Sequence, residues 1–269
     1  MTFWQKWSWW IVEGFIFTNI SFLAVDIYIA HSINHFHHKA EWIPLILSLV
    51  APCFLTFDLW RHKKTNGKCK YILGKIIGIL AIATGVAGLM YHLQSQFFTN
   101  QTIKSLVYTA PFVAPLAYSG LGFLILLNRT ICKNSVAWAK WIIFFAVGGF
   151  LGNFVLTLCD HAQNGFFHPT EWLPVISSAI AIGFLLAIIT MKYNQQFTSL
   201  VLGALGLQVF IGLMGFTIHL KAVLNGPHVQ LFNNIVYVAP VLAPLLFVNL
   251  AILGCIGVWD LSHKHKIAV

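Results

Sequence analysis

The chain has 269 residues, of which 58% are hydrophobic and only 9% are charged, and its mean hydropathy is +0.79. A soluble domain carries roughly a quarter charged residues, so this composition excludes a soluble globular protein and predicts an integral membrane protein. The formal net charge of +9 would favour nucleic acid as the partner of a soluble protein. Here the positions of the basic residues explain the charge, and the predicted partner is the lipid bilayer.

Eight apolar windows follow one another along the chain, each about 20 residues long, the length a helix needs to cross a bilayer. They are predicted at residues 9–31, 42–60, 71–92, 107–127, 141–160, 172–191, 199–219 and 234–258. Only helices and closed barrels satisfy their backbone groups in lipid, and runs of this length are typical of helices. The predicted fold class is therefore an all-α integral membrane protein with eight transmembrane helices.

The basic residues predict how the chain is oriented. Thirteen of the 16 Lys and Arg residues fall on the side of the two termini, and only Lys39, Lys104 and Lys221 fall on the other. By the positive-inside rule both termini are expected in the cytoplasm. The predicted location is the cell (inner) membrane, which the chain crosses several times.

A loop of the first half recurs in the second half. Seven of its residues return in the same order 130 positions later, without a gap. They are His31, Asn34, Phe36, His38, Glu41, Trp42 and Pro44, matched by His161, Asn164, Phe166, His168, Glu171, Trp172 and Pro174. This predicts a tandem duplication, with residues 1–133 as the first four-helix repeat and 134–269 as the second. Four crossings return the chain to the same side, so the repeats are expected to be parallel.

The pattern Tyr-x-Ala-Pro-x-x-Ala-Pro also recurs, starting at Tyr108 and again at Tyr237. Its prolines have two interpretations, a kink inside a spanning helix or a helix broken for a ligand or a gate. Gly85 and Gly88 precede the first pattern and are expected to allow close helix packing. They would also leave room for a flat ring below His92.

Three histidines and one glutamate recur in each half, at the ends of the spans away from the termini. The first set is His31, His38, Glu41 and His92, and the second is His161, His168, Glu171 and His219. In an up-down-up-down bundle the first and third helices are diagonal neighbours, so their ends can face a common volume. Three imidazoles and a carboxylate form a ligand set suited to a transition metal such as Fe, Cu or Zn. In such a centre Glu41 and Glu171 would act as ligand or general base.

A second chemistry fits a subset of these residues. Two histidines on diagonal helices of a four-helix bundle can supply both axial ligands of a haem b. The pairs would be His31 with His92 and His161 with His219. Two fused four-helix bundles of this kind are similar in architecture to haem A synthases and b-type cytochromes, whose motifs the chain does not carry. A purely structural interpretation also stays open, because histidine and tryptophan are common at membrane interfaces.

The leading functional hypothesis is a membrane protein with two pseudo-equivalent metal centres or haems at its extracytoplasmic face. It would be a membrane-bound oxidoreductase or electron carrier, acting with a redox partner or a quinone. The alternative is a secondary transporter whose outward-facing histidines handle cations or protons. A transporter should have polar residues near mid-membrane, where this sequence is nearly purely apolar. The carboxylates Glu13, Asp26, Asp58 and Asp160, within or near the spans, are further candidates for function.

Overall fold

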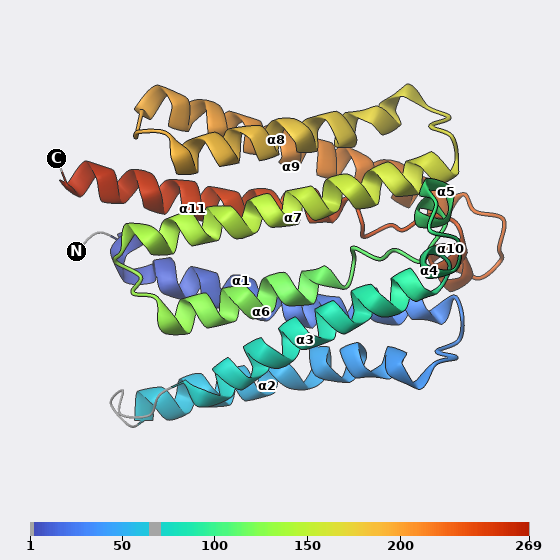
Figure 1. Ribbon diagram of the computed structural model, residues 1–269, viewed down its shortest axis with the longest axis horizontal. Helices are drawn as coiled ribbons and strands as arrows, with labels where there is room; N and C mark the ends of the chain where they lie inside the picture. Colours follow the sequence, from blue (N-terminus) through green and yellow to red (C-terminus); the bar gives the residue numbers. More distant parts are fainter. Residues whose placement is uncertain (1–2, 65–70, 269) are drawn as a thin grey trace.

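A computed structural model describes residues 3–64 and 71–268, and every regular element in this part of the chain is a helix. The long helices are α1 (Phe3–Ser32), α2 (Trp42–Lys64), α3 (Ile72–Gln94), α6 (Leu116–Thr130), α7 (Val136–Gln163), α8 (Trp172–Thr190), α9 (Gln195–Leu224) and α11 (Leu245–Ala268). The short ones are η1 (Lys39–Glu41), α4 (Phe97–Asn100), α5 (Ile103–Val107), η2 (Pro169–Glu171) and α10 (Leu231–Tyr237). The short helices lie at the end of the molecule away from the termini, which we call the outer end (Figure 1). The opposite end is called the inner end.

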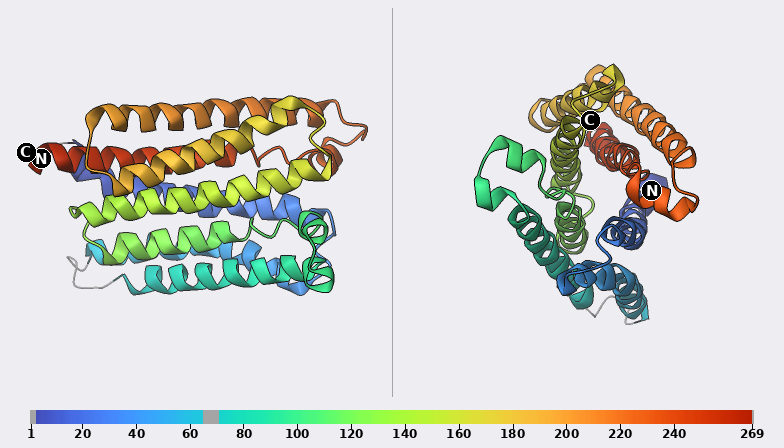
Figure 2. Two further views of the ribbon diagram at one scale, coloured as in Figure 1. Left: turned by 45° about the horizontal axis from the view of Figure 1, so that its top comes forward. Right: turned by 90° about the vertical axis from the view of Figure 1, so that its right-hand side faces the viewer.

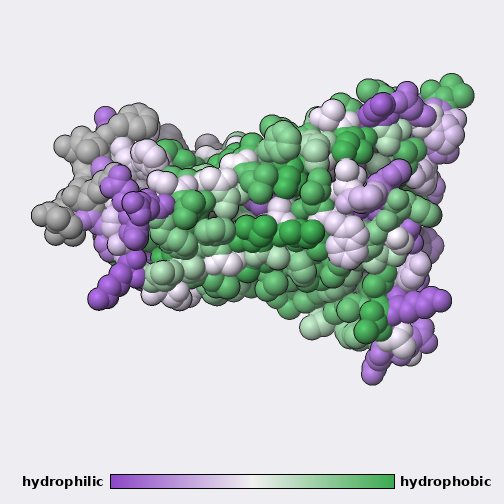
Figure 3. Space-filling model, turned by 90° about the horizontal axis from the view of Figure 1, so that it is seen from above, coloured by the Kyte–Doolittle hydropathy of each residue, from purple (hydrophilic) through white to green (hydrophobic). Residues whose placement is uncertain are grey.

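Seven of the described helices are long and apolar enough to cross a membrane. The remaining long helix, α6, has 15 residues, which is shorter than the roughly 20 that a bilayer requires. Apolar side chains cover the middle of the face seen in Figure 3, and hydrophilic side chains gather at both ends. These features support an all-α protein of the multi-pass membrane type.

The predicted fourth span, residues 107–127, is not one continuous helix. The structure has α5, then a non-helical segment with Pro111 and Pro115, and then α6. Proline lacks the amide proton that a helix needs, and its ring clashes with the preceding turn. Pro240 and Pro244 separate α10 from α11 in the same way. The recurring prolines thus lie between helices and do not kink a continuous one.

The long helices pack as two groups of four. In one group α1, α2, α3 and α6 are successive neighbours, and in the other α7, α8, α9 and α11 are. The groups meet where α1 packs against α11 and α6 packs against α7. Seen along the bundle, these four helices are central and the other four lie outside them (Figure 2, right).

One hydrophobic cluster runs through both groups. It includes Ile16 of α1, Leu124 of α6, Ile142 of α7, Leu205 of α9 and Ala251 of α11, each at most 1% exposed. Lipid tails are as apolar as these side chains, so close packing rather than exclusion of water must hold spanning helices together. The two groups therefore share one tightly packed interior.

At the inner end, Arg129 of α6 interacts with carboxylates on two other helices. Its guanidinium donates to Glu13 Oε1 of α1 at 2.8 Å and to Oε2 at 3.0 Å, and its Nε lies 4.0 Å from Asp58 Oδ2 of α2. That oxygen also accepts from the Gly74 amide of α3 at 2.9 Å. The three charged side chains are at most 6% exposed. Glu13 and Asp58 are thus engaged in ion pairing, and Arg129, which the sequence places in an inner loop, is buried between them.

Candidate functional site: two histidine pairs at the outer end

His31 lies in the last turn of α1, where the chain leaves the helix through a tight turn. The Asn34 and Phe36 amides both donate to the His31 carbonyl, at 3.3 and 3.2 Å. Phe36 has a φ of 52°, and its ring packs against Trp42 with 4.5 Å between centroids. The chain then continues through η1 and brings Glu41 back to the helix end. The result is a carboxylate beside an imidazole, with Glu41 Oε2 3.7 Å from His31 Nδ1.

The same contacts recur at the end of α7. The Phe166 amide donates to the His161 carbonyl at 3.1 Å, and Phe166 has a φ of 53°. Its ring stacks on Trp172 with 4.0 Å between centroids. Glu171 Oε2 then lies 3.5 Å from His161 Nδ1.

His92 and His219 occupy matching positions near the ends of α3 and α9. Nδ1 of His92 lies 2.9 Å from the Pro111 carbonyl, and Nδ1 of His219 lies 3.0 Å from the Pro240 carbonyl. A carbonyl can only accept, so Nδ1 must donate in both contacts. Both carbonyls belong to the non-helical segments that precede α6 and α11.

The role of these two carbonyls is not anticipated from the sequence. The recurrence of the prolines within the same eight-residue pattern is a signal that could have drawn attention to this segment. The interpretations drawn from that pattern, a kink or a broken helix, concern the helix itself and not a contact with histidine.

The two imidazoles of the first half lie close together, and those of the second half interact electrostatically. The rings of His31 and His92 are 6.2 Å apart between centroids, with an angle of 76° between their planes. His161 and His219 lie within electrostatic reach of one another. We call His31, Glu41 and His92 the first site, and the corresponding His161, Glu171 and His219 the second site.

The two glutamates are incompletely satisfied. Oε1 of Glu41 accepts from Asn34 Nδ2 at 2.9 Å. Oε2 of Glu41 and Oε2 of Glu171 are buried and have no hydrogen-bond partner among the described residues. Their distances of 3.7 and 3.5 Å to the histidines exceed the usual hydrogen-bond range of about 2.7 to 3.2 Å. Buried polar atoms are normally paired, so each site offers unused acceptor capacity.

His38 and His168 take a different place. Each precedes a short 3₁₀-helix, and its carbonyl accepts from the Glu41 amide at 3.0 Å or the Glu171 amide at 2.9 Å. Their side chains are exposed, and the His38 ring lies against that of His37 at 5.1 Å between centroids. Within residues 3–64 and 71–268, no three His, Cys, Asp or Glu side chains are arranged to hold one metal ion.

The glycines below His92 bring α3 against α6. A Cβ at Gly85 would lie 2.7 Å from the Ser119 nitrogen and 2.8 Å from the Pro115 oxygen, and one at Gly88 would lie 2.6 Å from Pro115 Cβ. Close packing is therefore confirmed as their role. The space beside them is filled by the start of α6, so these positions leave no room for a flat ring.

The interior is less apolar than the sequence predicts. Asn19 of α1 hydrogen-bonds to Asn249 of α11, where the two groups meet. Gln208 of α9 is fully buried and donates to the Ser177 carbonyl of α8 at 2.9 Å. Asn153 of α7 is 6% exposed, and its Nδ2 has no partner among the described residues. The prediction of nearly pure apolar helix centres is wrong at these places.

Asp26 and Asp160 are partly buried near the outer end. Neither takes part in a hydrogen bond or an ion pair that the described residues provide. Asp160 adjoins His161 in sequence, yet the carboxylate that approaches the His161 imidazole is that of Glu171.

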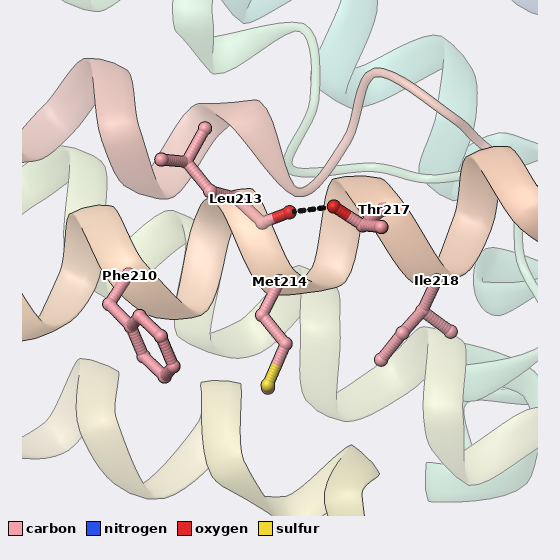
Figure 4. A pocket seen from close by; sticks show the side chains of 5 residues that line it. All are labelled: Phe210, Leu213, Met214, Thr217 and Ile218. Carbon is pink, nitrogen blue, oxygen red and sulfur yellow. Dashed lines mark hydrogen bonds between the residues drawn. The ribbon is translucent and has the colours of Figure 1, made fainter.

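An open groove of about 380 Å³ lies along α9 and ends one residue before His219. Figure 4 shows its five lining side chains, which are Phe210, Leu213, Met214, Thr217 and Ile218. The only hydroxyl among them, that of Thr217, donates to the Leu213 carbonyl at 2.8 Å. The groove therefore offers apolar contacts alone, as expected of a helix face turned toward lipid.

Comparison of the chain with protein-family models, with curated proteins and with solved structures found no match. The chemistry of the two sites is therefore argued from their geometry.

Proposed function

We propose that each site holds one haem b between its two histidines and that the protein transfers electrons at its outer face. His31 and His92 would hold one haem, and His161 and His219 would hold the other. The observation that carries this proposal is the approach of the His31 and His92 rings, each with its Nδ1 turned to an acceptor. When bound, the haem would supply one-electron chemistry.

The spacing of the two rings in the first site fits two imidazoles that bind one iron, and the haem ring would have to lie away from Gly85 and Gly88, where α6 fills the space. A metal–imidazole bond is about 2 Å long and the ring adds about 1 Å on each side, so the ring centroids should be on the order of 6 Å apart. The separation between His31 and His92 is 6.2 Å. Metal-binding imidazoles normally direct their second nitrogen to a carbonyl or carboxylate. Here Pro111 and Glu41 occupy those positions, which leaves both Nε2 atoms for the iron.

Glu41 and Glu171 lie beside His31 and His161 on the Nδ1 side, at 3.7 and 3.5 Å, and add negative charge to each site. In a non-haem version of the proposal they would be ligands or general bases, and His38 and His168 would complete each centre. The exposed side chains of His38 and His168 favour the haem version.

We also propose that α6 and the non-helical segment before it make an eighth crossing. The start of α1 and the end of α11 lie at the same end of the molecule (Figure 1), which requires an even number of crossings. α6 packs against α3 as α11 packs against α9, which supports two parallel repeats covering residues 1–133 and 134–269. The basic inner end faces the cytoplasm of a cell (inner) membrane.

The fitting role is that of a membrane-bound oxidoreductase or electron carrier. Both sites lie at the outer end and close to lipid. A membrane quinone is therefore a suitable electron donor or acceptor, with a second redox partner at the extracytoplasmic surface. We expect no nucleic-acid partner.

The test is an optical spectrum of detergent-purified protein, oxidised and dithionite-reduced, with metal analysis of the same sample. We expect two haems per chain, with a Soret band and sharp reduced α-bands. His92→Ala and His219→Ala should each remove one haem. His38→Ala and His168→Ala, the matched exposed histidines of the same loops, should remove none.

Two results would redirect the assignment. A featureless spectrum with two bound metal ions, lost in His38→Ala as well as in His92→Ala, would establish the non-haem centre. A protein with neither haem nor stoichiometric metal would reject the redox proposal.

The second candidate is a secondary transporter, favoured by the polar residues found inside the bundle. Asn153, Asp26 and Asp160 lack partners among the described residues, and parallel repeats occur in alternating-access carriers. A transporter predicts proton- or cation-coupled uptake into vesicles that contain cofactor-free protein. Loss of that uptake in Asp160→Asn would support this candidate.

A further inference from the structure

A basic pocket of about 340 Å³ lies at the inner end, between α7, α8 and α11. It is distant from both histidine sites and plays no part in the redox proposal. Its polar lining residues are Lys140, Lys192, Tyr193 and His265, and its apolar lining residues are Val136, Ile188, Met191 and Leu261.

No carboxylate lines this pocket. The acidic residues of the described inner end are Glu13, Asp58 and Asp260. Glu13 and Asp58 surround Arg129, while Asp260 is bound by Lys264 and by the Trp4 indole N–H. The positive charge of the pocket is therefore not balanced by a carboxylate side chain of the described residues.

The two lysines are held differently. Nζ of Lys140 donates to the Ile189 carbonyl at 2.9 Å, near the end of α8. Its charge is thus anchored at a helix C-terminus, a favourable place for a cation. Lys192 lies two residues beyond the end of α8, is exposed, and forms no ion pair with a described carboxylate.

Tyr193 and His265 form an ordered polar wall. The two rings stack with 4.9 Å between centroids and 18° between planes. The Tyr193 hydroxyl also hydrogen-bonds to the Ser262 hydroxyl of α11 at 3.0 Å. This wall connects the turn after α8 to the last helix, so the pocket is shaped by three helices together.

We propose that this pocket binds the phosphate head group of an anionic phospholipid. Two lysines, an imidazole and a phenol offer charge and hydrogen-bond donors to a phosphodiester. Basic pockets between helices on the cytoplasmic side are a known way to recognise anionic lipids. Ile188 of α8 and Leu261 of α11 lie on long apolar helices, farther from the inner end than Lys192 and His265, and would contact the acyl chains. Free phosphate shares the head-group chemistry but would leave this apolar part unused.

The test is native mass spectrometry of the detergent-purified full chain with phosphatidylglycerol, and with phosphatidylcholine as the neutral lipid. We expect one tightly retained phosphatidylglycerol, because the residues that correspond to Lys140 and Lys192 in the first half are Trp10 and His62. Lys192→Gln should weaken its binding roughly fivefold, as the loss of one lysine near an anionic lipid implies. Lys140→Gln should have a similar effect.

Lys63→Gln is the control, since Lys63 lies at the same end but outside the pocket. Equal retention of phosphatidylcholine would overturn the proposal, and so would equal weakening by Lys63→Gln. If inorganic phosphate displaces phosphatidylglycerol at the concentration at which phosphatidylglycerol itself binds, the ligand is free phosphate and the lipid assignment is wrong.

Discussion

His35 and Phe36 hold backbone conformations that side chains rarely adopt, with φ values of 56° and 52°. Left-handed backbone costs a residue with a Cβ roughly 1–2 kcal/mol. In the second loop the corresponding residues are Gly165 and Phe166, so glycine avoids one of these two costs. Both loops have a Phe at the second position, and its ring packs on the Trp that begins the next long helix.

His35→Gly should therefore stabilise the protein. We expect the free energy of unfolding to rise by about 1 kcal/mol, seen as a higher thermal midpoint in detergent. The reverse exchange in the other loop, Gly165→His, should lower the midpoint. A lower midpoint for His35→Gly would show that its side chain makes a contact worth more than the strain.

If the two sites hold haems as proposed, their carboxylates should tune the haem potentials. Glu171→Gln removes a negative charge that favours the oxidised state. We expect the potential of one haem to rise, on the order of tens of millivolts, in a spectroelectrochemical titration. Glu41→Gln should raise the potential of the other haem. A potential that does not change in either variant would contradict this role of the glutamates.

The contact between α3 and α6 depends on small residues at particular positions. At Gly85 an added Cβ would meet backbone atoms of α6, which cannot move away as a flexible side chain can. At Gly203 of α9, by contrast, nothing lies within 4 Å of an added Cβ.

Gly85→Ala should lower the free energy of unfolding by about 1–3 kcal/mol, because it overpacks the interface. Gly203→Ala is the matched control and should be neutral or slightly stabilising, since alanine favours helix. Thermal denaturation of both variants in the same detergent measures the difference. Equal midpoints would mean that α3 and α6 can separate at no cost.

The inner ends of α1, α2 and α6 are held by one buried cation. Arg129→Leu leaves Glu13 and Asp58 buried without their counter-charge, which typically costs about 3–5 kcal/mol. We expect a large fall in the thermal midpoint. Partial recovery in the triple variant with Glu13→Gln and Asp58→Asn would show that the unpaired carboxylates cause the loss, whereas no recovery would assign it to packing.

Each group of four helices contributes a short outer helix that covers the other group. Nε2 of Gln163 on α7 donates to the Val107 carbonyl of α5 at 2.7 Å. On the other side, the Tyr28 ring of α1 lies 6.3 Å from that of Phe232 of α10. The segment after each short helix also supplies the carbonyl that holds His92 or His219. This carbonyl comes from the same half as its histidine, whereas the short helix lies against the other half, so both halves contribute to the surroundings of each site.

The proposed topology can be checked by cysteine labelling in intact cells. Phe167 is 80% exposed at the outer end, and Cys132 is exposed at the inner end. A membrane-impermeant maleimide should label Phe167→Cys from outside, while Cys132 should react only after permeabilisation. Labelling of Cys132 in intact cells would show that the orientation is the reverse of the proposed one or that the number of crossings differs.

Composition and residue order were sufficient to predict a helical membrane protein, because hydropathy along a span is a local property. The same holds for the depth of the histidines, since a residue's distance along a helix follows from its position in the chain. The sequence also indicates which glutamates belong with which histidines, through their recurrence. It leaves open whether the paired prolines kink a helix or break it, and it does not indicate that Arg129 is buried.

Which imidazoles meet is a property of the folded chain. Residues 31 and 92 are brought together by the lateral packing of helices, and Pro111 reaches His92 only because the chain is not helical there. His38 shares the recurring motif with His31, yet the turn into η1 uses its backbone and leaves its side chain exposed. Neighbours across a bundle depend on the packing of every helix between them. That packing is non-local and cannot be obtained from spacing along one helix.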